Sequence, residues 1–274
     1  MDESQSTPGR YALGHSDHEL DRLEAQARIV DPVTRHLWSH AGVGQGMRVL
    51  DVGCGAGHTT MLLADLVGES GEVVGIDSAP EAIAAAQARS SGLRNMSYIH
   101  DDPTEHIFDT PFDAVVGRYV LMFQSDPAAF LAAAAHHARP RGIVSFHELD
   151  AQGIASRPLV PTFEKVAAWN SDVTRRYGAN PNFGSCLLGV YLTAGLPEPT
   201  ILAHAIHGRG AGALDVLTQC RNLARTLLPE LERHGVASRE EVGIDTLLDR
   251  MLTEATQSDS IVVGHLQVGA YCIV

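Results

Sequence analysis

The chain has 274 residues, which suits one α/β domain with an appended cap or two small lobes. Its net charge of −13 opposes binding to a phosphate backbone, so nucleic acid is excluded as the expected substrate. No apolar run reaches the ~18 residues that a membrane-spanning helix needs. The four cysteines show no CxxC spacing, so we expect a soluble cytoplasmic protein with free thiols, and a homodimer is left open.

Strands and helices alternate in the first half of the chain. A helix is expected from Ser16 to Val30, with a kink or break at Asp31-Pro32 and a second segment ending near His40. Beyond it, apolar runs predict strands and capping or proline signals predict helices. The strands cover 47–52, 72–77, 96–102, 112–118 and 141–149, and the helices cover 57–68, 78–91 and 126–139. This alternation predicts an α/β fold with a doubly wound, mainly parallel sheet.

The second half is less regular and adds two late strands, which would make seven in all. Helices are expected over 159–177, 185–195, 211–228 and 238–256, and strands over 200–207 and 260–274. Residues 208–258 exceed an ordinary connection between strands, so we interpret them as a helical substrate cap. The expected organisation is an N-terminal helical lid (1–40), a core (41–207 and 259–274) and this inserted cap.

The most informative segment runs from Val49 to His58. A buried apolar strand ending in Asp51 is followed by glycines at 53, 55 and 57 and then by a helix start. Glycine permits a tight turn and a close backbone approach to a ligand, and the free N–H groups of a helix N-terminus suit an anionic group. A dinucleotide-binding fingerprint would need a third glycine at position 58, where this chain has histidine.

The segment Asp51-Val-Gly-Cys-Gly-Ala-Gly57 resembles the first motif of class I S-adenosyl-L-methionine (SAM) dependent methyltransferases. Three further predicted strands follow in the order that the family has, and they end at Asp77, at Asp101-Asp102 and at Arg118. The resemblance covers about residues 10–206. It implies a Rossmann-like methyltransferase fold with an antiparallel C-terminal edge and SAM as cofactor.

The resemblance also implies roles for individual residues. Asp77 would accept hydrogen bonds from the ribose hydroxyls, and Asp102 would take the adenine amino group. Family members usually donate a backbone N–H to the ring from the next residue, but Pro103 has none, so that contact is missing or supplied elsewhere. The residues expected at the cofactor are Tyr11, Gln26, Asp51, Gly53, Cys54, Gly55, Asp77, Ser78, Asp102, Pro103 and Arg118.

Three residues near the ends of the fourth and fifth strands are candidates for catalysis. By the family resemblance Tyr119, which follows Arg118, would face the acceptor; the alternative is that it packs a helix. His147 and Glu148 close the fifth strand, where neighbouring side chains point to opposite faces. His147 would be a general base or a structural histidine, and Glu148 would lie at the pocket floor. Although the chain has 14 histidines, no metal-ligand spacing is present and we expect no metal site.

The expected function is therefore methyl transfer from SAM to a small-molecule acceptor, an aromatic or apolar metabolite, as in the branch that modifies quinone precursors and secondary metabolites. An alternative with the same cofactor site is a natural-product enzyme that catalyses a cyclisation or rearrangement without methylation. A nicotinamide-dependent oxidoreductase is disfavoured by His58. A SAM sensor without enzymatic activity is disfavoured by the long cap.

Overall fold

The structure is a computed structural model that describes residues 17–176 and 178–274, with side chains described from Ala27 onward. The chain divides into two compact units. We call Val30–Glu148, Phe183–Ala203 and Val268–Val274 the core unit. The described residues 17–29 form the helical unit together with Leu149–Asn182 and His204–Gln267. The predicted division into lid, core and cap stays a prediction.

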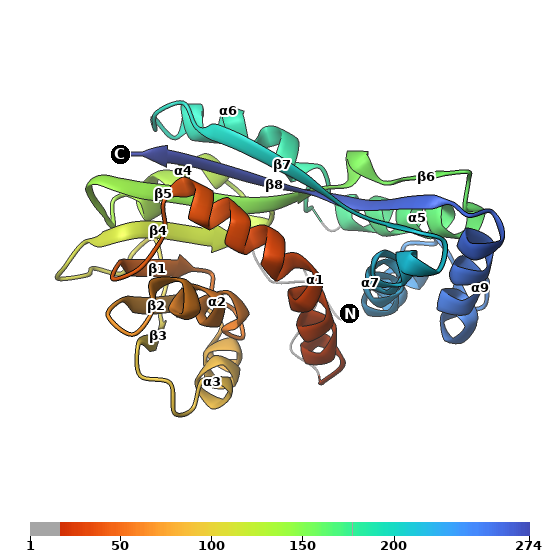
Figure 1. Cartoon of the computed structure of the whole chain (residues 1–274), viewed down its shortest axis with the longest axis horizontal. Coiled ribbons are helices and arrows are strands. Elements are labelled where there is room, and N and C mark those ends of the chain that lie inside the picture. The colour runs from red at the N-terminus through yellow and green to blue at the C-terminus, as the bar shows by residue number, and fades with distance from the viewer. Residues whose placement is uncertain (1–16, 177) are drawn as a thin grey trace, which may run out of the picture. The chain divides into compact units, whose positions relative to one another are not determined.

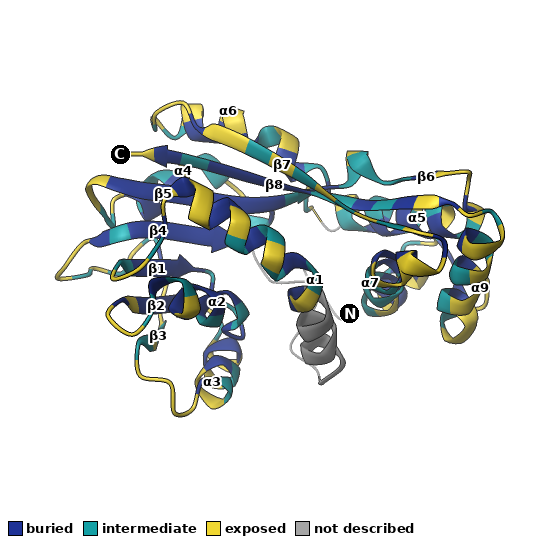
Figure 2. Cartoon of the chain, in the orientation of Figure 1, coloured by how far each residue is buried: buried dark blue, intermediate teal, exposed yellow. Residues whose placement is uncertain are grey.

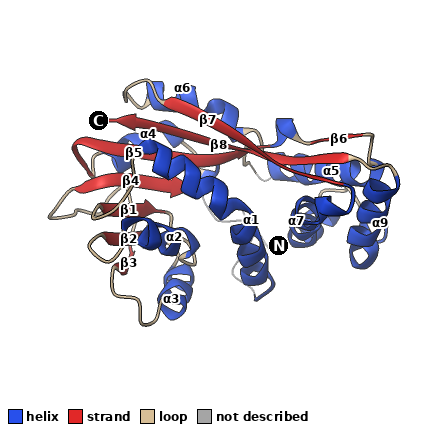
Figure 3. Cartoon of the chain, in the orientation of Figure 1, coloured by secondary structure: helices blue, strands red, loops and turns tan. Residues whose placement is uncertain are grey.

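Figures 1 and 3 show the helices and strands. The α-helices are α1 (Asp17–Ala41), α2 (His58–Val67), α3 (Pro80–Arg89), α4 (Pro127–Ala135), α5 (Pro161–Arg176), α6 (Leu187–Thr193), α7 (Leu214–Arg233), α8 (Arg239–Val242) and α9 (Ile244–Gln257). The strands are β1 (Arg48–Val52), β2 (Glu72–Asp77), β3 (Met96–His100), β4 (Phe112–Arg118), β5 (Ala138–Asp150), β6 (Ala155–Arg157), β7 (Thr200–Arg209) and β8 (Ile261–Ile273). None of the helices in the described residues combines the length and the apolar character needed to cross a membrane.

The core unit contains a mainly parallel sheet with the order β3-β2-β1-β4-β5-β8, in which β7 also pairs with β8. The pairs β1–β2, β1–β4, β2–β3 and β4–β5 are parallel. The strand order reverses between β1 and β4, and open α/β sheets bind ligands at the carboxyl ends of strands beside such a reversal. The predicted α/β class is confirmed.

Both faces of this sheet are covered, as parallel sheets require. On one face, Trp38 of α1 and Leu63 of α2 pack with Val49, Val73 and Val116 from the strands. On the opposite face, where the neighbouring residues of each strand point, Leu50 of β1, Val115 of β4 and Val144 of β5 are also fully buried. Figure 2 shows the strands as the most continuously buried part of this unit. The apolar runs of the sequence therefore correspond to strands buried on both sides.

The helical unit has a core of its own, in which α5, α7 and α9 pack on one another. Phe163, Leu217, Leu227, Leu247 and Met251 are among the buried side chains of this cluster. Leu217 and Leu227 of α7 and Leu247 of α9 are buried in this cluster, on the faces by which these helices pack. β6 pairs antiparallel with the first residues of β8 within the same unit.

Three sequence predictions for individual elements need correction. The expected break at Asp31-Pro32 is wrong, because α1 continues through Pro32 to Ala41. The expected helix 238–256 is two helices: the capping box of Ser238 and Glu241 starts α8, and Gly243, at a left-handed φ of 55°, ends it before α9 begins. The described residues contain eight strands instead of seven, since the three-residue β6 gives too short a pattern to detect.

The Tyr191 side chain ties α6 to two strands of the core unit. Its hydroxyl donates to the carbonyl oxygen of Ala270 at 2.8 Å and accepts from the Phe146 N–H at 3.2 Å. Tyr191 is fully buried. Without its hydroxyl, the Ala270 carbonyl and the Phe146 N–H would be unpaired, because water cannot reach them to replace it.

We predict that Tyr191→Phe lowers the free energy of unfolding by about 1–3 kcal/mol, because it leaves buried backbone groups unpaired. Urea unfolding followed by circular dichroism measures this loss. Tyr271→Phe is the matched control, since Tyr271 is only partly buried, and it should change the free energy by less than about 0.5 kcal/mol. Equal effects of the two variants would contradict the role of the Tyr191 hydroxyl.

Candidate functional site

The candidate site lies in the core unit, at the carboxyl ends of the parallel strands beside the reversal of strand order. The loops after β1 and β4 meet there. A Cβ atom added to Gly53 would lie 2.7 Å from Cγ2 of Val120, which is closer than carbon atoms approach. Glycine at position 53 is therefore required by this close approach as well as by its φ of 67°.

The glycine loop after β1 has one open side. Gly53, Gly55 and Gly57 all have positive φ, at 67°, 52° and 83°. A Cβ atom at Gly57 would collide with the Tyr98 hydroxyl at 2.7 Å, whereas a Cβ atom at Gly55 would meet nothing within 4 Å. The loop is thus packed at both ends and accessible in the middle, as a loop that cradles a nucleoside cofactor must be.

Asp77, at the end of β2, links the glycine loop to the next helix. One oxygen of its carboxylate accepts from the Gly55 N–H at 2.9 Å, and the other accepts from the Ala79 N–H at 2.9 Å, just before α3. Asp77 is half-buried. Since a carboxylate has about four acceptor positions, two remain for other donors such as the hydroxyls of a ribose. The arrangement fits the cofactor that the glycine loop predicts.

Asp51 supports the glycine loop from below. Its Oδ2 accepts from the hydroxyls of Thr59 and Thr60 at 2.7 Å and 2.6 Å, and these hydrogen bonds anchor the start of α2. Its Oδ1 is buried without a partner among the described residues. Burial raises the pKa of Asp51 to about 6, although the hydrogen bonds from Thr60 and Thr59 act to lower it. These two threonines were not singled out from the sequence, although a Thr-Thr pair at a helix start was a signal available there.

The Cys54 side chain points away from the open side of the loop. A Cβ atom at Gly75 of β2 would lie 3.0 Å from the Cys54 sulfur, so the thiol packs against that strand. Burial raises the pKa of the thiol well above its usual value. A cofactor contact from Cys54 would therefore come from its backbone.

Asp102 and Pro103 follow β3 and differ in exposure. Asp102 is exposed and accepts from the N–H and hydroxyl of Thr104 at 2.8 Å and 2.6 Å, whereas Pro103 is buried. Ser78, the residue after Asp77, is exposed and its carbonyl oxygen lies 3.2 Å from Nε2 of His100. The three residues lie at neighbouring strand ends, where the sequence predicts them.

The Arg118 side chain is occupied by contacts with α1. It forms a salt bridge with Asp31 at 2.7 Å and donates to the Thr34 hydroxyl at 3.0 Å, and the side chain is 8% exposed. A cofactor contact from Arg118 would therefore use its backbone.

His147 is fully buried, and its Nδ1 lies 3.1 Å from the Thr34 hydroxyl. Thr34 donates its single proton to the Val30 carbonyl and accepts from Arg118. His147 must then donate from Nδ1 to the Thr34 hydroxyl oxygen. The Tyr119 ring lies 5.4 Å from the imidazole, and Tyr119 has a left-handed φ of 58°.

Glu148 has different partners from His147, as neighbouring strand residues should. One oxygen accepts from the N–H groups of Val120 and Leu121 at 3.0 Å and 2.7 Å, and Oε2 is buried without a partner among the described residues. Burial raises the pKa of Glu148 to about 8, although the N–H groups of Leu121, Val120 and Met122 act in the opposite direction. Glu148 is thus protonated at neutral pH and holds the loop after β4.

Sequence reasoning used His58 only to exclude a dinucleotide motif. Its Nε2 is buried without a partner in the described part of the chain. Burial, with help from the guanidinium groups of Arg89 and Arg118, lowers its pKa to about 4. A neutral imidazole therefore lies at the first residue of α2, immediately after the glycine loop. Of the remaining predicted residues, Tyr11 lies outside the described residues, and only the backbone of Gln26, in α1, is described.

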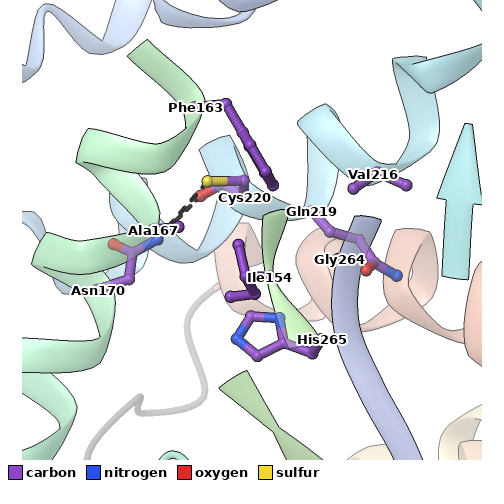
Figure 4. A pocket seen from close by; sticks show the side chains of 9 residues that line it. All are labelled: Ile154, Phe163, Ala167, Asn170, Val216, Gln219, Cys220, Gly264 and His265. Atoms are coloured by element: carbon purple, nitrogen blue, oxygen red, sulfur yellow. Dashed lines mark hydrogen bonds between the residues drawn. The ribbon is translucent and has the colours of Figure 1, made fainter. Parts of the chain in front are cut away.

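A small cavity of about 10 Å³ lies wholly within the helical unit (Figure 4). It is the size of one water molecule, so in this conformation it does not accommodate an acceptor. Asn170 donates to the Cys220 carbonyl at its edge, and burial lowers the pKa of His265 to about 4. Among the described residues, no group of three or more His, Cys, Asp or Glu side chains could hold a metal ion.

The buried carboxyl of Glu148 makes stability depend on pH. Its pKa is about 8 in the folded protein against a usual 4.5. Between these values the folded state holds a proton that the unfolded state releases, so stability decreases as pH rises. We predict that Glu148→Gln, which keeps the oxygen that accepts from Val120 and Leu121, gains roughly 2–4 kcal/mol relative to the wild type between pH 5 and pH 8.5.

Unfolding free energies of both proteins across this pH range measure the effect. Other titrating groups are common to the two proteins and cancel in the difference. A difference that does not change with pH would contradict the raised pKa.

Comparisons with known proteins agree with this geometry. A family model described as a methyltransferase domain matches residues 44–188. A demethylmenaquinone methyltransferase of Staphylococcus aureus is 32% identical over 135 residues, covering 49% of this chain and 54% of the relative. An aklanonic acid methyltransferase of a Streptomyces species is 36% identical over 135 residues, covering 48% and 60%. The chain therefore spans a little over half the length of these two relatives.

A crystal structure from Galdieria sulphuraria, described as a candidate sarcosine dimethylglycine methyltransferase, superposes with a TM-score of 0.54 at 13% identity. The match covers 94% of this chain and 92% of that one, and it is a likeness of fold. Since the family model matches more than half of the chain, this protein belongs to the family of methyltransferase domains, the class I SAM-dependent methyltransferases, whose cofactor is S-adenosyl-L-methionine.

Proposed function

We propose that this protein transfers a methyl group from SAM to a small-molecule acceptor of aromatic or apolar character. The observation that carries the proposal is the open glycine loop, tied through its Gly55 N–H to the carboxylate of Asp77 at the reversal of strand order. The two relatives named for small-molecule acceptors, demethylmenaquinone and aklanonic acid, support this substrate class. The net charge of −13 argues against a nucleic acid acceptor.

Each predicted cofactor residue has a role in this proposal. The backbones of Gly53, Cys54 and Gly55 face the cofactor, and Asp77 with Ser78 binds the ribose. Asp102 and Pro103 lie at the adenine, and the Arg118 backbone lies at the methionine part. Asp51 holds the glycine loop, and Tyr11 and Gln26 close over the carboxylate end. When bound, SAM supplies a methyl group on a positively charged sulfur, and the protein has to align it with the acceptor and keep water out.

We assign the acceptor side to Tyr119 and His147, with Glu148 in support. The imidazole of His147, oriented through its Nδ1 by the Thr34 hydroxyl, suits a general base for an acceptor hydroxyl or amine. Glu148, protonated at neutral pH, is less suited to accept a proton and instead holds the loop that carries Tyr119. All four cysteines are free thiols, which supports a cytoplasmic enzyme, and we place it in secondary metabolism.

Binding of SAM or S-adenosylhomocysteine should raise the melting temperature, because the ligand binds the folded state. We predict that Asp77→Ala weakens binding at least tenfold in calorimetry, since it removes both the ribose acceptor and the anchor of Gly55. Asp65→Ala, which removes an exposed carboxylate 70% accessible to solvent, is the control and should bind like the wild type. Equal binding by both variants would contradict the proposed site.

Turnover separates methyl transfer from a non-methylating reaction. Labelled SAM is incubated with the protein and candidate aromatic metabolites, and the label is followed by mass spectrometry. Methyl transfer predicts S-adenosylhomocysteine and a labelled product in equal amounts. Conversion of an acceptor without S-adenosylhomocysteine would overturn the proposal in favour of a cyclisation or rearrangement.

The Thr34 hydroxyl should matter for turnover if His147 is the base. We predict that Thr34→Val lowers kcat by about 10–100-fold and shifts the acid limb of the pH–rate profile, because the proton is no longer held on Nδ1. Thr34→Ser keeps the hydroxyl and should retain most activity. Unchanged binding of S-adenosylhomocysteine shows that both variants are folded. A Val variant as active as the Ser variant would rule out this role for Thr34.

A further inference from the structure

Arg221, in the helix α7, is a partly buried cation without a partner. Among the described side chains, the partly buried arginines are Arg35, Arg48, Arg89, Arg118 and Arg221. The first four each donate to a carboxylate or a carbonyl oxygen within 3.2 Å. Arg221 has no acceptor within residues 17–176 and 178–274, and its Nε is buried. Because native proteins pair charges that they take out of water, this exception needs an explanation.

Arg225 lies one turn further along α7 and adds a second positive charge to the same face. It is exposed, and in the described part of the chain it has no ion-pair partner either. Burial, and after it the charge of Arg225, lowers the pKa of Arg221. The two guanidinium groups therefore repel each other without a carboxylate to offset the repulsion.

The helix itself offers neither arginine a counter-charge. A helical residue reaches the positions three and four residues away. Apart from the two arginines themselves, those positions hold only uncharged residues: Leu217, Thr218, Asn222, Ala224, Leu228 and Pro229. The acids near the end of α7 are engaged elsewhere, since Glu230 accepts from Arg233 at 2.6 Å and Glu232 pairs with Arg239 at 3.4 Å. The arginine pair is thus an uncompensated positive site in a chain of net charge −13.

The same face of α7 continues toward the start of the helix with Thr218 and Leu214. Residues 214, 218, 221 and 225 are spaced by four, three and four, so they follow one face of the helix. Leu214 is a large apolar side chain that is 44% exposed. At about 1.5 Å of rise per residue, it lies roughly 10 Å from Arg221 along the helix axis. A ligand that matches this face has an apolar body and an anionic end.

We propose that this face of α7 binds such a ligand, with Arg221 and Arg225 on its anionic group and Leu214 against its apolar part. The anionic group is a carboxylate or a phosphate, because the planar guanidinium presents paired N–H donors that match either one. α7 lies within residues 208–258, the segment that the sequence predicts as a substrate cap. The ligand is then the methyl acceptor, an aromatic or apolar acid, and this identity rests on the proposed function.

Calorimetry of the full chain without SAM tests the site with three probes: naphthoate, naphthyl phosphate and the neutral naphthamide, all substituted at the same ring position. We expect at least one of the two anions to bind at least about tenfold more tightly than the amide, because only an anion makes charge-assisted hydrogen bonds with both arginines. The tighter anion shows whether the group is a carboxylate or a phosphate. A smaller advantage for both anions overturns the proposal.

Three variants that each lose one positive charge locate the effect. Arg221→Met and Arg225→Met should each remove the advantage of the anion, whereas Arg233→Met, on the same helix but paired with Glu230, should keep it. Because Arg221 has no partner to lose, Arg221→Met should not lower the melting temperature, which a merely structural arginine would do. If Arg221→Met and Arg225→Met bind the anion like the wild type, the proposal is wrong.

Turnover with labelled SAM tests whether the ligand of this site is the acceptor. We expect an aromatic acid to be methylated, and Arg221→Met to raise KM for it at least about tenfold with kcat retained, because the arginine binds the acceptor away from the reacting atoms. An unchanged KM overturns the assignment of the acceptor. If S-adenosylhomocysteine binds and no anionic probe does, only this inference fails. If the probes bind and S-adenosylhomocysteine does not, the proposed function fails and the anion site stands.

Discussion

The site depends on the Asp77 carboxylate, which joins two loops that come from different strands. By accepting from Gly55 and from Ala79, it fixes the glycine loop after β1 relative to the start of α3 after β2. The backbone at Gly55 is thereby held in a left-handed conformation with its outer side open. Because the same carboxylate retains acceptor capacity, one side chain can organise the loop and also receive a ligand.

The acids at the strand ends do different work because their surroundings differ. Asp51 is fully buried and serves the hydroxyls of Thr59 and Thr60, Asp77 is half-buried between two loops, and Asp102 is exposed. Desolvation acts strongly on the first and leaves the last free to meet a ligand. Exposure to solvent therefore increases from Asp51 through Asp77 to Asp102, across three neighbouring strands.

A second set of contacts links α1 to the ends of β4 and β5. Arg118 reaches Asp31 and Thr34, and Thr34 in turn orients the imidazole of His147. On the next residue, the Glu148 carboxyl holds the loop after β4 through N–H groups. These contacts position the side chains that we assign to the acceptor, and Thr34, His147 and Glu148 among them are buried.

The sequence by itself determined the sheet, the glycine loop and the acids at the strand ends, because local rules govern them: apolar runs form buried strands, and only glycine adopts the positive φ of that loop freely. Tertiary structure alone decided the pairing of Thr34 with His147, 113 residues apart, and the raised pKa of Glu148. It also decided that α1 continues through Pro32. Desolvation and hydrogen-bond partners arise from packing between distant segments, so no local pattern encodes them.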